Sequence, residues 1–158
     1  MRPEIIVKQK GLCPYDPCYQ DMRQFTQQRG PDETDQIWLL QHPPIYTLGL
    51  AADENHILKQ NAIEVARIDR GGQVTYHGPG QLILYPLINL KRLQCSMIDL
   101  VNALEQATLN LLESYGLQGT TNTKARGVYL HGAKIAALGL KVSKGCSYHG
   151  LALNVSND

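Results

Sequence analysis

The segment Arg70–Leu90 reads RGGQVTYHGPGQLILYPLINL, and it holds four glycines in the eleven positions after Arg70. Glycine adopts backbone angles that other residues avoid, so main-chain N–H groups near it can face a ligand closely. The two glycine clusters bracket a strand of four or five residues, and polar side chains add donors. The segment therefore predicts either two tight turns around a strand or a ligand-binding loop, and its residues leave both open.

The glycine spacing excludes two common nucleotide-binding loops. A phosphate-binding P-loop requires a Gly-Lys-Ser/Thr sequence, and none follows here. A dinucleotide-binding loop requires a different glycine spacing and a helix immediately after it, whereas Gln81–Ile88 has the pattern of a buried strand. The sequence therefore predicts no nucleotide cofactor at this segment.

Outward from this segment, strands and helices do not alternate strictly. Ser96 begins the clearest helix, with Asp99 three residues later in a capping-box arrangement and Gly116 as its stop signal. Further strands are expected at Glu4–Val7, Ile37–Leu40, Ile45–Leu50, Ile63–Ile68, Gly127–Leu130, Ile135–Val142 and Ser147–Val155, and further helices at Asp16–Gly30 and Asp53–Gln60. This order predicts an α+β fold, with a mixed, largely antiparallel sheet and flanking helices.

The two longer predicted helices have recognisable ends and faces. Asp16 is predicted to N-cap the first, with Pro17 at its first position and Gly30 at its end. Seven residues are predicted to share one face of the second: Ile98, Val101, Leu104, Thr108, Leu111, Leu112 and Tyr115.

Length and composition restrict the class of protein. The chain has 158 residues, which argues for a single domain spanning residues 1–158. Hydrophobic residues make up 43% and charged residues 18%, an ordinary globular composition that excludes a disordered chain. The net charge of +1 gives no bulk attraction to nucleic acid or to an acidic membrane, so neither is expected as a partner.

Targeting signals and cysteine usage favour a cytoplasmic protein. No apolar run approaches the roughly 18 residues of a membrane span, and no apolar segment of a secretory signal follows Arg2. Cys13, Cys18, Cys95 and Cys146 lack paired metal spacing and are too few for a disulfide scaffold. Reduced thiols are therefore expected.

Two further segments carry candidate chemistry. Lys134 lies near the start of GAKIAALGL (132–140). It is either an exposed strand end or, if partly buried, a lysine that exchanges a proton or stabilises a thiolate. In SYHGLALN (147–154), Gly150 and Ala152 are small enough for a long apolar ligand to pass over the strand. Cys146 and His149 are three residues apart on that strand and so point to opposite faces, which argues against a metal site.

Together these segments resemble the octanoyltransferases of lipoate biosynthesis, the lipoate-protein ligase B family. The similarity is closest in RGGQVTYHGPGQLILYPLINL, GAKIAALGLKVSKG and CSYHGLALNVSND. It implies the biotin/lipoate protein ligase catalytic-domain fold. It also implies transfer of an octanoyl group from octanoyl-acyl carrier protein to a lysine. The acceptors are lipoyl domains of 2-oxoacid dehydrogenases and the glycine-cleavage H protein.

The resemblance also implies the roles of particular residues. No metal or cofactor is required, and a cysteine takes the acyl group as a thioester. By motif match, Lys134 is the catalytic lysine that lowers the pKa of this cysteine. The implied substrate-binding residues are Arg70, Gly71, Gly72, Gln73, Val74, Thr75, Tyr76, His77, Ala137, Leu138, Gly139, Gly150, Leu151 and Ala152.

The family's nucleophilic cysteine lies in a Pro-Cys-Gly element about ten residues beyond the position that matches Asp158, where this sequence ends. We therefore expect a domain that lacks its C-terminal part and a chain that is inactive by itself. One alternative is a non-catalytic remnant that binds an acyl group or a carrier protein. Another is a different acyl-transfer chemistry that uses Cys146 or His149.

Overall fold

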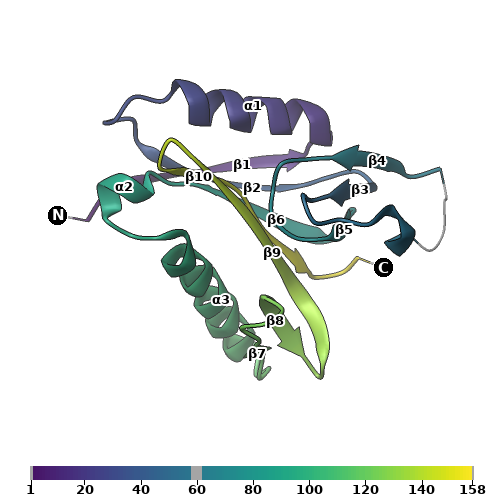
Figure 1. Ribbon diagram of the computed structural model, residues 1–158. Coiled ribbons are helices and arrows are strands. Elements are labelled where there is room, and N and C mark those ends of the chain that lie inside the picture. The colour runs from purple at the N-terminus through teal and green to yellow at the C-terminus, as the bar shows by residue number, and fades with distance from the viewer. Residues whose placement is uncertain (1, 58–61, 158) are drawn as a thin grey trace.

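The computed structural model describes residues 2–57 and 62–157 (Figure 1). Its helices are α1 (Tyr15–Gln28), α2 (Leu90–Leu93) and α3 (Met97–Ser114), with a 3-10 turn at Glu54–His56. Its strands are β1 (Ile5–Leu12), β2 (Asp35–Gln41), β3 (Ile45–Leu48), β4 (Glu64–Arg67), β5 (Val74–His77), β6 (Gln81–Leu87), β7 (Thr120–Thr121), β8 (Gly127–Leu130), β9 (Ala133–Ser143) and β10 (Cys146–Asn154).

The strands form two sheets. Within the described residues, the larger sheet has seven strands in the order β1-β2-β6-β10-β9-β8-β7, and the smaller has three in the order β4-β3-β5. β1 pairs with β2 in parallel, and the other neighbours in the larger sheet run antiparallel. The prediction of an α+β fold with a mixed, largely antiparallel sheet is confirmed.

Helix α1 covers one face of the larger sheet (Figure 1). Its buried residues Tyr15, Cys18, Met22 and Thr26 recur at helical spacing, so they form one stripe. Cys18 and Met22 pack against Trp38 of β2 and other sheet residues in one hydrophobic cluster. This packing shields one face of the larger sheet from solvent.

Helix α3 packs on the opposite side, near β8 and β9. Its capping box is present as expected, because Ser96 Oγ accepts from the Asp99 backbone N–H and Asp99 Oδ2 accepts from the Ser96 backbone N–H. Leu112 joins a second hydrophobic cluster with Val128 and Ala136.

The expected apolar face of α3 is only partly buried. Leu112 and Thr108 are buried, but Ile98 is 51% and Tyr115 is 76% exposed. Only part of the helix rests on the sheet, and its N-terminal turn with Ile98 instead lines a cleft, described below. The periodicity of the sequence identified the residues that share this face of α3, but it did not show which of them pack on the sheet and which line the cleft.

Other details differ from the sequence expectations. Helix α1 begins at Tyr15, so Asp16 lies in its first turn and the predicted Asp16 cap is wrong. Pro17 fits there because the first N–H groups of a helix have no intrahelical partner. The α2 turn was not expected. The helix expected at Asp53–Gln60 is a 3-10 turn at Glu54–His56, and residues 58–60 of that prediction lie outside the described residues.

A buried ionic cluster joins α1, β2 and the α2 turn. The Asp35 side chain is fully buried, and its Oδ1 accepts from Arg29 Nη2 at 2.7 Å and from the Asn89 N–H at 2.8 Å. Arg92 Nη2 lies 2.9 Å from Asp35 Oδ2. Three chain segments therefore depend on one carboxylate for their relative position.

Candidate functional site

A cleft of about 790 Å³ opens between the glycine-rich segment, α3 and the strands β9 and β10. This volume is within the range of about 300–1,000 Å³ typical of small-molecule sites. Its lining residues are Arg70, Gly71, Gly72, Gln73, Val74, Thr75, Tyr76, Gln81, Met97, Ile98, Val101, Lys124, Ala125, Arg126, Lys134, Ala137, Leu138, Gly139, Leu140, Ala152, Asn154 and Asn157.

A narrow pocket of about 30 Å³ adjoins the cleft. The two share Arg70, Thr75, Ala137, Leu138, Gly139 and Ala152. The rest of the narrow pocket is lined by Tyr15, His77, Ile83, Tyr85, His149, Gly150 and Leu151. The cleft and the narrow pocket are therefore two parts of one site, with Arg70 at their junction.

The structure brings together all the catalytic and substrate-binding residues that the resemblance implies. Lys134, Arg70 to His77, Ala137 to Gly139 and Gly150 to Ala152 each line the cleft, the narrow pocket or both. Three segments far apart in the sequence thus share one cavity. The roles of these residues in binding and catalysis stay predictions.

Small residues let the glycine-rich segment approach the larger sheet. Gly139 of β9 pairs with Gly150 of β10, and Ala137 pairs with Ala152. A Cβ on Gly139 would lie 3.0 Å from Arg70 Cδ and 3.2 Å from the Gly71 carbonyl oxygen. A side chain at position 139 would therefore displace the Arg70 segment from the cleft.

Arg70 is buried without a carboxylate partner among the described residues. Its Nη2 donates to the Thr47 carbonyl oxygen at 3.0 Å, to Thr47 Oγ1 at 2.9 Å and to the Gln73 carbonyl oxygen at 3.0 Å, while Nη1 donates to the Gly71 carbonyl oxygen. Burial lowers the pKa of Arg70 from its ordinary value, although a guanidinium stays charged at neutral pH. A positive charge held only by neutral oxygens favours an electron-rich ligand group beside it.

The charge on the cleft wall has one sign. Among the described residues, the lining includes the cations Arg70, Lys124, Arg126 and Lys134, and no aspartate or glutamate. Arg126 is paired with Glu105 at 3.0 Å behind the wall. The Lys134 side chain is exposed, and its Nζ lies 5.6 Å from the centre of the Tyr129 ring. Of the two alternatives for Lys134, the structure has the exposed one, at the edge of the cleft.

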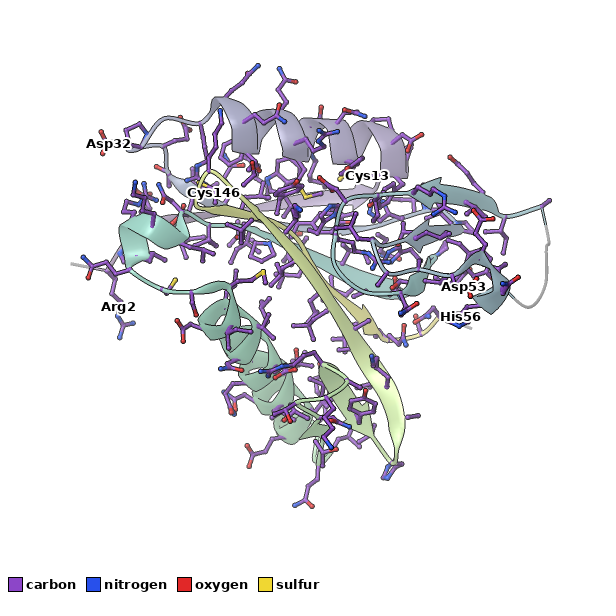
Figure 2. All side chains as sticks on the ribbon, in the orientation of Figure 1. Arg2, Cys13, Asp32, Asp53, His56 and Cys146 are labelled. Carbon is purple, nitrogen blue, oxygen red and sulfur yellow. The ribbon has the colours of Figure 1, made fainter. Side chains whose placement is uncertain are left out.

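None of the four cysteines lines the cleft or the narrow pocket. Burial raises the pKa of Cys18 to about 12, so it is a thiol at neutral pH. Cys146 is buried where β10 begins (Figure 2). It pairs with Ser143, which lies at the far end of β9 from Lys134. Lys134 and Ser143 are nine positions apart along the extended strand, about 30 Å. Cys146 therefore does not act together with Lys134.

Several lining residues escaped the sequence analysis. Met97, Ile98 and Val101 form the α3 wall, and Lys124 and Arg126 come from the loop before β8. The apolar residues at the start of an amphipathic helix and the basic residues in a polar loop are visible in the sequence. Their position beside Lys134 depends on packing alone.

A polar cluster stands beside the narrow pocket. Asp69 Oδ1 accepts from Tyr19 at 2.8 Å and lies 2.8 Å from His149 Nε2, and Asp69 Oδ2 accepts from Tyr148. These hydrogen bonds hold the pKa of Asp69 well below its ordinary value, against the opposing effect of burial. The cluster ties α1 and β10 to the residue that precedes Arg70.

Buried histidines make the folded state sensitive to acid. Burial lowers the pKa of His77 to about 4, and it also lowers the pKa values of His42 and His149. Below pH of about 6.5 the unfolded chain binds protons that these folded imidazoles do not, so stability falls as the pH falls from about 6.5 to about 4. The lowered pKa of His77 alone corresponds to a loss of about 3 kcal/mol in the free energy of unfolding at about pH 4.

Urea unfolding at pH 7.5, 6, 5 and 4 checks this expectation. The wild-type chain is expected to lose stability in steps below pH 6.5, and His77→Gln is expected to lose about 3 kcal/mol less over the same range. His56, which lies on the surface, supplies the control substitution His56→Gln, which is expected to leave the profile unchanged. A His77→Gln profile parallel to wild type contradicts the assignment.

Two other features of the described residues bear on function. No group of three or more His, Cys, Asp or Glu side chains in residues 2–57 and 62–157 is arranged to hold a metal ion. In the same part of the chain, no helix has the length and apolar character needed to cross a membrane.

Comparison with solved structures shows the fold. A crystal structure of lipoate-protein ligase A bound with ATP aligns with a TM-score of 0.73 and 15% identity, over 100% of this chain and 68% of the other. A putative lipoate protein ligase from T. acidophilum with bound lipoic acid gives a TM-score of 0.74 and 17% identity, over 100% and 70%. The predicted lipoate ligase fold is confirmed.

Comparison of sequences shows the family. Residues 14–158 match the model of the lipoyl protein ligase A/B catalytic domain. The octanoyltransferase of Methylococcus capsulatus is 52% identical over 150 residues, which are 95% of this chain and 72% of that protein. The octanoyltransferase of Ectopseudomonas mendocina is 50% identical over 156 residues, which are 99% and 76%. The chain therefore belongs to the octanoyltransferases, a family of acyltransferases with the lipoyl protein ligase A/B catalytic domain.

Proposed function

We propose that this chain carries the acyl-binding site and the catalytic lysine of an octanoyltransferase. The enzyme moves an octanoyl group from acyl carrier protein to a lysine of a lipoyl domain, through a cysteine thioester. The observation that carries the proposal is the single cavity formed by the three matched segments, with Lys134 at its edge. We also propose that residues 1–158 belong to one catalytic domain and that the protein acts in the cytoplasm, in keeping with its four free cysteines.

The apolar part of the cavity suits the octanoyl chain. Val74, Ala137, Leu138 and Ala152 offer carbon surface without polar side chains, and Ile98 and Val101 of α3 face them across the cleft. An octanoyl group has seven carbons beyond its carbonyl carbon. At about 0.8 kcal/mol for each buried methylene, full enclosure contributes roughly 5 kcal/mol of binding free energy.

The charged part of the cavity suits the transfer chemistry. A cysteine thiolate, favoured by the Lys134 ammonium, attacks the carbonyl carbon of the donor thioester. The new thioester forms, and the carrier's sulfur leaves as a thiolate and takes a proton from Lys134, which becomes a neutral amine. The acceptor amine then attacks the new thioester, an amide bond forms, Lys134 takes the proton of the acceptor amine, and the cysteine is released as a thiolate.

The cationic lining also suits the acyl donor. An acyl carrier protein holds its acyl group on an arm that is joined through a phosphodiester, which is an anion. Lys124 is exposed at the cleft, and no acidic side chain among the described lining residues opposes it. The expected donor is octanoyl-acyl carrier protein, and the expected acceptors are lipoyl domains of 2-oxoacid dehydrogenases and the glycine-cleavage H protein.

The nucleophile is proposed to lie outside residues 1–158. None of the four cysteines (Cys13, Cys18, Cys95 and Cys146) is among the described residues that line the cavity, and Cys146 is about 30 Å of strand away from Lys134. We therefore expect residues 1–158 to bind the acyl group without becoming acylated.

Intact mass measurement tests the proposal. Two proteins are incubated with octanoyl-acyl carrier protein: residues 1–158, and an extended chain. In the extended chain, residues 1–157 are joined to the segment that follows the matched region in the Methylococcus capsulatus octanoyltransferase. Only the extended chain is expected to gain an octanoyl group that hydroxylamine removes, and to pass it to a lipoyl domain.

The other outcomes have distinct meanings. An adduct on residues 1–158 contradicts the placement of the nucleophile, and its position identifies the cysteine that acts. Acyl binding with no adduct on either protein supports instead a non-catalytic acyl-binding remnant. Absence of both binding and adduct contradicts the proposed function.

A further inference from the structure

Thr47 of β3 contacts two residues of the cavity at once, although it lines neither the cleft nor the narrow pocket. Its side chain is fully buried. Its Oγ1 accepts from Arg70 Nη2 at 2.9 Å and lies 3.3 Å from His77 Nε2. The three sequence segments that match the family do not include Thr47.

The direction of each hydrogen bond at Thr47 follows from its neighbours. A guanidinium only donates, so Thr47 Oγ1 accepts from Arg70 and keeps its own hydrogen free to donate. At the other end, Gln81 Nε2 donates to the Tyr76 carbonyl oxygen and to Asn154 Oδ1, so Gln81 Oε1 faces His77. His77 Nδ1 therefore donates to Gln81 Oε1, at 2.8 Å, and its Nε2 is the acceptor for the Thr47 hydroxyl.

This arrangement agrees with the environment of His77. The ring is buried, and burial lowers its pKa to about 4, so the neutral form with hydrogen on Nδ1 is present at neutral pH. The hydrogen bonds run in one direction, from Arg70 through Thr47 and His77 to Gln81. No other proton arrangement satisfies all four side chains with a neutral imidazole.

The position of Arg70 matters because it stands where the cleft meets the narrow pocket. Its Cδ packs over Gly139, where a Cβ would lie only 3.0 Å away. A shift of the guanidinium therefore changes the wall that a ligand passes on its way between the two.

We propose that Thr47 is a positioning residue of this site: its hydroxyl holds Arg70 at the junction of the cleft and the narrow pocket and donates to Nε2 of His77, whose tautomer is set by Gln81. The part of this inference that concerns ligand affinity rests on the proposed octanoyl-binding function. The part that concerns His77 does not. The hydroxyl is the essential group, since the Thr47 carbonyl oxygen stays available to Arg70 in any variant.

Thr47→Val and Thr47→Ser separate the hydroxyl from the shape of the side chain. Valine keeps the volume and removes the hydroxyl, whereas serine keeps the hydroxyl and removes a methyl group. A control is Thr26→Val, because Thr26 is also buried but its hydroxyl donates to the Met22 carbonyl oxygen within α1. Thermal melting identifies any variant that does not fold.

Two measurements on the 158-residue chain test the proposal. The first is the imidazole nitrogen NMR spectrum, with His77 assigned from His77→Gln. Thr47→Val is expected to shift the His77 Nε2 signal, while Thr47→Ser and Thr26→Val keep it in place. The second is the affinity for octanoyl-pantetheine. Thr47→Val is expected to weaken it about tenfold, the loss of one hydrogen bond to a charged group, and the other two to keep it within about twofold.

The outcomes distinguish this inference from the function on which it rests. A wild-type chain that binds no octanoyl-pantetheine overturns the proposed function, and the His77 signal alone then decides the role of Thr47. If Thr47→Val leaves the His77 signal unchanged, the positioning role is wrong. If serine disturbs the site more than valine does, Thr47 acts through packing, and the positioning role is likewise wrong.

Discussion

Replacing Lys134 with alanine in the extended chain is expected to lower octanoyl transfer at least about 1,000-fold while leaving the fold intact. Lys134 is exposed at the cleft edge, so its removal leaves no buried cavity. The loss falls on the barrier instead, because one side chain both favours the thiolate and accepts the proton of the attacking amine. About 4 kcal/mol of transition-state stabilisation corresponds to this factor.

A matched control and a partial rescue sharpen the test. Lys141 lies on the same strand but lines neither the cleft nor the narrow pocket, so Lys141→Ala is expected to retain full transfer. Lys134→Arg keeps the positive charge but does not deprotonate, so it is expected to form the acyl-enzyme and fail to pass the group on. Single-turnover assays of the two half-reactions measure this split. Near-normal turnover with alanine at position 134 refutes the role.

The second large effect concerns stability. Asp35→Ala is expected to lower the free energy of unfolding by about 3–5 kcal/mol, because it leaves the Arg29 guanidinium, only 2% exposed, without its carboxylate. The same change removes the ion pair with Arg92 and the acceptor for the Asn89 N–H. The end of α1, the start of β2 and the α2 turn then lose their common anchor.

Urea unfolding of matched variants measures this effect. Glu54 pairs with Arg67 on the surface, where both side chains are more than 60% exposed, so Glu54→Ala is expected to change stability by less than about 1 kcal/mol. Asp35→Asn keeps the shape and removes the charge, and it is expected to fall between the two. A loss below about 1 kcal/mol for Asp35→Ala contradicts the anchoring role of the cluster.

The features that the sequence predicted correctly are those that depend on neighbours along the chain. The Ser96–Asp99 capping box forms because its two partners are three residues apart. Gly116 follows the end of α3 because the chain there takes a left-handed backbone conformation, which glycine adopts without steric strain. Strand β5 lies between its two glycine clusters for the same local reason. The antiparallel pairing of β7 to β10 followed from strands that succeed one another without an intervening helix, whereas α2 and α3 lie between β6 and its antiparallel partner β10.

The candidate site also combines features that the sequence predicted with contacts that only the folded structure reveals. The motifs identified the residues that line the cavity, because residue types such as Gly139 and Gly150 are set by how closely two backbones approach. The sequence did not reveal that Ile98 faces the cleft, that Thr47 contacts Arg70, or that Cys146 lies at the opposite end of β9 from Lys134. Strand register and the packing of α3 decide those contacts.

By itself, the sequence determined the family, the largely antiparallel α+β fold and the list of residues that gather around the cavity. Only the tertiary structure decided that Lys134 is exposed at the cleft edge, that no carboxylate among the described residues pairs with the buried Arg70, and that none of the four cysteines lines the cavity. The physical reason is the distance along the chain between the residues that interact. Capping, turns and strand patterning are fixed by interactions within a few residues, whereas burial and charge pairing arise between segments that meet only when the two sheets pack.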